Sequence, residues 1–185
     1  MMEQAHAGEG HHHIVLIALS DDQIIADGAA GLGDVGNTAG VGTLNVIRKG
    51  EESVGKGAVS LGIATDLGIA DAAVRNALAG CNMLVFESNY DSAMLDASSR
   101  PLHTKRRIRS FKGHMGNDDA MQELPDLIGE ETQMITLVHV SRECNDYSLV
   151  DSMARNMLSA IHREDIYLDV ARQDDICRPF CFCRS

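Results

Sequence analysis

Carboxylate and imidazole side chains stand at or just after the ends of apolar runs in this sequence. Asp66 and His139 each come at the end of a strand-like apolar run, and Glu87 closes another. His114 lies in a loop flanked by Gly113 and Gly116. Carboxylate oxygens and imidazole nitrogens are the ligands that hydrolytic metal sites use, held rigidly and open to water. We therefore expect a metal-hydrolase site collected from separate strands.

The elements that must position these side chains follow from the periodicity of the apolar residues. Strands are expected over residues 14–19, 43–48, 59–65, 83–87, 133–139 and 165–171, and helices over 71–78, 117–128 and 149–161. Residues 43–48 and 59–65 are expected to pair. Asn117 is expected to cap its helix, and Pro125 to kink or shorten it. Apolar strands that alternate with helices predict an α/β fold, a sheet covered by helices.

Five ordered motifs carry a family resemblance. They are TDLG at 65–68, LVFESNYD at 84–91, RRI at 106–108, GHMGN at 113–117 and LVHVSRECN at 137–145. Together they resemble the metallo-β-lactamase-fold hydrolases, in their bacterial exonuclease-like and phosphodiesterase-like branch. The resemblance runs over residues 59–173 and implies an αββα layered sandwich.

The resemblance also implies roles for the chemical residues. Asp66 matches an aspartate that bridges two metal ions, and His139 matches the last ligand histidine; the ions would be zinc or manganese. His114 would donate a proton or support the ligands, with Glu87 orienting it. A capping or turn-forming Asp66 and a purely structural His139 are the alternatives that spacing alone leaves open. Arg106, Arg107 and Asn117 are the candidate substrate-binding residues, and Asn89 and Asn117 are alternatively expected to fix the loops that carry the site.

The HxHxDH cluster that supplies most metal ligands in this family is absent from the sequence. His11, His12 and His13 form a cluster near the N-terminus, but no Asp-His pair follows them. The chain is therefore expected to be the C-terminal half of the fold, with a replaced, truncated or frameshifted N-terminal half. Two retained ligands cannot enclose two divalent ions, so the dinuclear site is expected to be incomplete and activity doubtful.

Three hypotheses remain open at this point. The chain is a phosphodiesterase or nuclease-like metallo-hydrolase by descent, with an incomplete site. Alternatively, it is an inactive remnant or a regulatory half-fold that acts through protein association. Thirdly, it is an intact enzyme in which His11, His12 and His13 supply ligands in an unfamiliar order.

Charge bears on the substrate. The chain has 16 Lys and Arg against 27 Asp and Glu, a net charge of -11, so its overall field repels a phosphodiester backbone. One local exception is the basic run from His103 to Lys112. A solvated basic face and a clamp for substrate phosphates both account for this run.

Domain organisation and location complete the expectations. We expect a disordered N-terminus over 1–13, one domain over 14–173 and a Cys-containing tail over 174–185. Five cysteines without a secretory signal indicate a reducing compartment, and no apolar run is long enough to span a membrane, so a cytoplasmic protein is expected. A half-fold would expose an apolar sheet face unless residues 14–48 cover it, which predicts homo-oligomers.

Overall fold

The structure is a computed structural model that describes residues 15–19, 23–27, 45–48, 60–175 and 177. The N-terminus expected to be disordered over 1–13, with His11, His12 and His13, and most of the tail expected over 174–185 lie outside these residues. The described elements, in chain order, are β1 (Val15–Leu19), β2 (Gln23–Asp27), β3 (Asn45–Arg48), β4 (Leu61–Thr65), α1 (Ala72–Leu78), β5 (Met83–Glu87), α2 (Ser92–Ala97), α3 (Leu102–Ile108), α4 (Asn117–Leu127), β6 (Met134–Val138), α5 (Tyr147–Ala160) and β7 (Tyr167–Val170).

Five strands form one sheet in the order β3-β4-β5-β6-β7. The four from β4 to β7 are parallel, whereas β3 pairs with β4 in the antiparallel sense, as expected for residues 43–48 and 59–65. β1 and β2 form a separate antiparallel pair. Because the four parallel strands run in one direction, their carboxyl ends meet at one edge of the sheet, where ligand sites of α/β proteins commonly lie.

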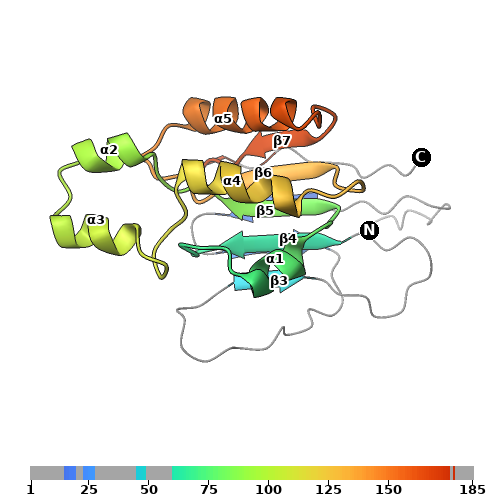
Figure 1. The fold of residues 1–185 in the computed structure, drawn as a ribbon, viewed down its shortest axis with the longest axis horizontal. Coiled ribbons are helices and arrows are strands. Elements are labelled where there is room, and N and C mark those ends of the chain that lie inside the picture. Colours follow the sequence, from blue (N-terminus) through green and yellow to red (C-terminus); the bar gives the residue numbers. More distant parts are fainter. Residues whose placement is uncertain (1–14, 20–22, 28–44, 49–59, 176, 178–185) are drawn as a thin grey trace, which may run out of the picture.

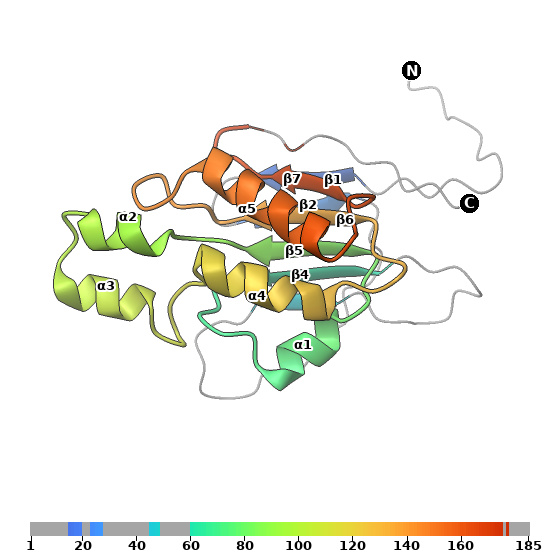
Figure 2. The same cartoon turned by 45° about the horizontal axis from the view of Figure 1, so that its top comes forward.

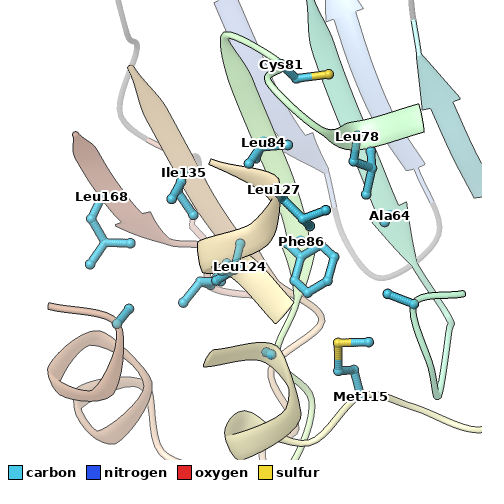
Figure 3. Packing of buried hydrophobic residues seen from close by; sticks show 14 of the residues in the cluster. Ala64, Leu78, Cys81, Leu84, Phe86, Met115, Leu124, Leu127, Ile135 and Leu168 are labelled. Carbon is cyan, nitrogen blue, oxygen red and sulfur yellow. The ribbon is translucent and has the colours of Figure 1, made fainter. Parts of the chain in front are cut away.

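The core lies between this sheet and the helices α1, α4 and α5, which cover one of its faces (Figure 1). β5 is central and buried along its whole length, which explains why its sequence is apolar throughout rather than alternating. Phe86 is fully buried in β5 and points into the helix-facing core near Leu124 and Leu127 of α4 (Figure 3). The predicted α/β class, a parallel sheet layered with helices, is thus confirmed.

The opposite face of the sheet carries a second apolar cluster: Ile63, Met83, Val85, Met134 and Val138. All five are at most 7% exposed. Figure 2 draws β1 and β2 on this side of the sheet, away from α4 and α5. In the structure this face is therefore buried. Whether the chain forms homo-oligomers stays a prediction.

Helix ends follow from short polar side chains, with one departure from expectation. Asp71 caps α1 by accepting a hydrogen bond from the backbone N–H of Val74, and Asp146 caps α5 in the same way. Asn117 is not the cap expected for α4: Gly116 takes that position, because the Asn117 side chain is buried. Pro125 lies in the last turn of α4, which ends two residues later.

The short helices α2 and α3 were not expected from the sequence. α3 buries none of its residues and α2 buries only Leu95, so neither has the apolar periodicity that marks a helix packed on a core. Both project beyond the carboxyl ends of β4 and β5 (Figures 1 and 2). They lie at the edge where the chemical residues gather.

The described cysteines are buried in the fold. Cys81 and Cys144 are both buried. Cys177, which lies in the segment expected as a tail, is 6% exposed. Among the described residues, no helix combines the length and the apolar character needed to cross a membrane.

Candidate metal centre

Three neighbouring strands deliver the acidic and imidazole groups to one edge of the sheet. Asp66 follows β4, Glu87 is the last residue of β5, and His139 follows β6. His114 comes from the loop before α4, which is tied to this edge by two contacts. Its neighbour Met115 accepts a backbone hydrogen bond from Asn89 at 2.8 Å, and Tyr90 and Gly116 form an isolated parallel bridge. The order of the parallel strands thus brings distant motifs together.

Asp66, His114 and His139 form a compact cluster, as expected from the sequence. One ligand atom from each lies within 4.8 Å of the other two. Asp66 Oδ1 is 3.7 Å from His114 Nδ1 and 3.6 Å from His139 Nδ1. The two imidazole rings meet edge to face, with centroids 4.9 Å apart. A carboxylate and two imidazoles therefore face a common point.

Glu87 lies beneath this cluster and contacts both histidines. Its Oε1 is 2.9 Å from His114 Nδ1 and 3.0 Å from His139 Nδ1, while its Oε2 accepts a hydrogen bond from the backbone N–H of Leu67 at 3.0 Å. The sequence had suggested that Glu87 orients His114. Its contacts with His139 and with the Asp66–Leu67 segment were missed. One carboxylate therefore links three of the segments that build the site.

Glu87 is fully buried, and its charge is held by its neighbours. Burial by itself would raise the pKa of this carboxyl, because it disfavours the charged form. The hydrogen bonds from His114 and His139, together with the attraction of these imidazoles, outweigh burial and leave the pKa of Glu87 below its usual value. An ionised carboxylate offers enough lone pairs for all three N–H groups.

Two of the clustered residues have an unusual backbone. Asp66 and His139 have φ angles of 58° and 60°, in the left-handed region that residues other than glycine rarely adopt. Only one other non-glycine residue of the described part, His162, has a positive φ. Such a conformation costs about 1–3 kcal/mol and persists where the surroundings enforce it. Both side chains are thereby turned from the strand ends toward one point.

The cluster is open to solvent although its support is not. The side chains of Asp66, His114 and His139 are 46%, 32% and 22% exposed, whereas that of Glu87 is 0% exposed. Three nitrogen and oxygen donors with an open side are the ligand set of a catalytic zinc ion, which keeps one position for water. The residues present therefore fit one divalent ion.

A buried amide network holds the loops that carry the site. The Asn117 side chain accepts from Ser88 Oγ at 2.8 Å and exchanges two 2.8 Å hydrogen bonds with Asn145. Asn145 also donates to the Ser88 carbonyl, and Asn89 donates to the His139 carbonyl at 2.7 Å. Asn117, expected at the substrate, is only 2% exposed and lies within this network. The role of Asn145 was missed, although it lies in the same motif as His139.

Arg106 and Arg107 lie in the last turn of α3 and are exposed. In the described part of the chain neither has an acidic partner. Two other residues of the basic run have structural roles: Lys105 donates to the carbonyls of Asp96 and Ser98, and Arg109 pairs with Asp96 at 2.7 Å. The basic run thus divides into residues that join α2 to α3 and residues that face solvent.

Comparison with known proteins relates the site region to two nucleases. The chain is 36% identical to "Exodeoxyribonuclease YycJ" of Bacillus anthracis over 104 residues, which are 56% of this chain and 38% of that protein. It is 28% identical to "Exodeoxyribonuclease WalJ" of Streptococcus pneumoniae serotype 2 over 95 residues, 51% of this chain and 35% of that protein. The chain thus matches less than two-fifths of each relative. These relatives confirm the resemblance predicted from the motifs.

Two further comparisons complete the picture. Among solved structures, the metallo-β-lactamase-fold protein YhfI from Bacillus subtilis superposes with a TM-score of 0.45 and 10% identity, over 89% of this chain and 47% of that one. No model of a protein family matches the sequence.

Proposed function

Because the site region is related to exodeoxyribonucleases, we propose that this chain contributes a divalent-metal centre for hydrolysis of phosphodiester bonds in DNA, from a strand end. The single observation that carries the proposal is the cluster of Asp66, His114 and His139 above the buried Glu87. An acid this deeply buried, engaged by two imidazoles at the open edge of a parallel sheet, is what a metal site requires beneath its ligands.

Asp66 and His139 are the proposed metal ligands. Both follow strand ends with a left-handed backbone, so their side chains are fixed before any ion arrives. Zinc or manganese would supply Lewis-acid polarisation of the phosphoryl oxygen and a water of lowered pKa. The Nδ1 of His139 faces Glu87, so in the neutral ring the single proton belongs on Nδ1. Nε2 then keeps the lone pair with which it can bind a metal ion.

His114 is the proposed proton donor to the leaving oxygen. Its Nδ1 contacts Glu87 at 2.9 Å, so the buried carboxylate holds the ring in position for this step. The distance of His114 from Asp66 favours a second role, as a third ligand. The substitution His114→Gln separates these roles. If His114 is a proton donor, the variant should have a lower kcat and unchanged metal affinity. If His114 is a third ligand, the variant should bind metal more weakly.

The electrostatics of the chain support a local rather than a global attraction for DNA. The net charge of -11 opposes binding, so phosphate contacts must come from exposed cations near the site. Arg106 and Arg107, at the end of α3, are the proposed contacts to the backbone. A DNA substrate agrees with the cytoplasmic location expected from the sequence, which stays a prediction.

Hydrolysis of an end-labelled DNA strand by the purified chain tests this function. The chain is incubated with Mn²⁺ or Zn²⁺ and the products are resolved by length, beside Asp66→Ala. The matched control is Asp118→Ala, an exposed aspartate in the first turn of α4. The proposal expects stepwise, metal-dependent shortening that Asp66→Ala abolishes and Asp118→Ala retains. Background rates in every sample would favour the inactive half-fold instead.

A further inference from the structure

An exposed basic and aromatic surface lies beside the proposed metal centre. Six of the chain's 16 Lys and Arg fall within residues 97–117, a stretch without Asp or Glu. This stretch covers α3 and the loop that leads to His114. In a chain of net charge -11, so uniform a segment marks a local region of opposite sign.

Half of these six cations are engaged by the fold. Arg100 pairs with Glu143, Arg109 pairs with Asp96, and Lys105 binds backbone carbonyls. The other three, Arg106, Arg107 and Lys112, have no acidic partner among the described residues, and all three are exposed. Their charge is therefore available to a ligand.

Phe111 precedes Lys112 in this stretch and is exposed to solvent. It is 57% exposed, and Lys112 Nζ lies 5.6 Å from the centre of its ring. The residue is also fixed beside the metal centre. A Cβ on Gly68 would lie 2.0 Å from the Ser110 carbonyl oxygen and 3.0 Å from the Phe111 carbonyl carbon. The backbone just after Asp66 thus packs directly on the backbone that carries Phe111.

We propose that Phe111, Lys112, Arg106 and Arg107 form a binding surface for single-stranded DNA that leads to the Asp66 cluster. The proposal rests on the proposed function, and it names the strandedness of the substrate. The Phe111 ring stacks on an unpaired base while the three cations contact backbone phosphates, the combination by which proteins hold single strands. Bases inside a duplex already stack on each other and cannot offer a face to the ring. The occupant is therefore a single strand or a frayed end.

Binding measured without hydrolysis tests this surface. Fluorescence anisotropy of a labelled oligothymidylate, in EDTA, gives its affinity for the chain and for variants, with a blunt duplex of equal length for comparison. Phe111→Ala should weaken single-strand binding about 5-fold to 100-fold, the range of one base stacked on one aromatic ring. Phe111→Leu keeps the apolar surface without the ring and should fall between. The matched control is Leu102→Ala, which removes another exposed apolar residue, 63% exposed, from the start of α3.

An oligonucleotide with abasic sugars separates stacking from charge. The wild-type chain should bind it as weakly as Phe111→Ala binds the complete strand, and Phe111→Ala should lose little more. Arg107→Ala should lower the slope of log affinity against log salt by about 0.7, the contribution of one phosphate contact. Equal affinity for single strand and duplex, or for wild type and Phe111→Ala, would overturn the inference.

The surface and the proposed function can fail separately. Single-strand binding that depends on Phe111, without metal-dependent cleavage, would refute the nuclease and leave the surface standing. Cleavage that requires Asp66, with strand affinity unaffected by Phe111→Ala, would refute the surface and leave the nuclease standing. Concentration-dependent oligomers that Phe111→Ala dissolves would assign the ring to a second copy of the chain and refute its role in DNA binding.

Discussion

Replacing Glu87 with Gln should weaken both the fold and the metal affinity of the site. The substitution keeps the size and shape of the side chain but removes the negative charge and converts one acceptor oxygen into an N–H donor. Glu87 contacts three groups: His114 Nδ1 at 2.9 Å, His139 Nδ1 at 3.0 Å and the Leu67 N–H at 3.0 Å. The variant cannot serve all three with unchanged partners.

The expected magnitude follows from the two orientations of the new amide. If its nitrogen faces Leu67, a buried backbone N–H meets a second donor, which costs about 1–3 kcal/mol. If its nitrogen faces the imidazoles, both rings must give up the Nδ1–H form. The smaller cost of burying an amide than a carboxylate offsets part of the loss. We expect the free energy of unfolding to fall by about 2 kcal/mol and metal affinity to fall about 10-fold to 100-fold, the usual effect of losing a carboxylate behind a ligand histidine.

Urea unfolding followed by far-ultraviolet circular dichroism, with Mn²⁺ titration in parallel, measures both effects. The control is Glu123→Gln, the same chemical change in a surface carboxylate that pairs with Arg75. The Glu123 side chain is 18% exposed and that of Arg75 45%, so this variant should lose at most about 1 kcal/mol of stability and should keep its metal affinity. Unfolding and metal affinity of Glu87→Gln that match those of Glu123→Gln would refute the structural role assigned to Glu87.

Two further substitutions test the loops around the site. Gly68→Ala should destabilise the chain by about 1–3 kcal/mol in the same urea assay, because its Cβ would overlap the Ser110 carbonyl oxygen. The control is Gly80→Ala, at a position where φ is +71° and no atom lies within 4 Å of the added Cβ. This control should cost about 1 kcal/mol from backbone strain alone. A Gly68→Ala variant as stable as wild type would contradict the close approach of these loops. Asn145→Ala should lower the free energy of unfolding by about 2 kcal/mol or more, because it leaves the buried Asn117 amide without its partner. The control Asn156→Ala changes an exposed asparagine and should leave the free energy of unfolding unchanged. Equal stability of the two variants would contradict the role of the amide network.

Much of the sheet and the outline of the site could be predicted from the sequence. The apolar runs that end in Thr65, Glu87 and Val138 each form a buried parallel strand, because strands covered on both faces need no polar alternation. Since parallel strands share their carboxyl edge, Asp66 and His139 were expected to lie together. His114 was expected beside them, and the structure places it in that cluster.

Other features depend on contacts between distant segments. Asn117 has the residue type of a helix cap, but its side chain pairs with Asn145, 28 residues away, and local sequence carries no sign of that pairing. The short helix α3 buries nothing, so its periodicity holds no signal. The contact of Glu87 with His114 depends on how the loop before α4 folds back over β5, and its contact with His139 depends on the pairing of β5 with β6. These are tertiary effects that override local preference.

Isothermal titration calorimetry of the purified chain with Mn²⁺ and with Zn²⁺ tests most directly whether the cluster is a metal centre. If Asp66 and His139 bind a divalent ion above Glu87, the wild type should bind about one ion per chain, as three donors and one open position allow. Asp66→Ala should weaken binding by at least about 10-fold, and Asp118→Ala should leave it unchanged. No saturable binding, or binding that Asp66→Ala does not affect, would contradict the claim that this cluster is a metal centre.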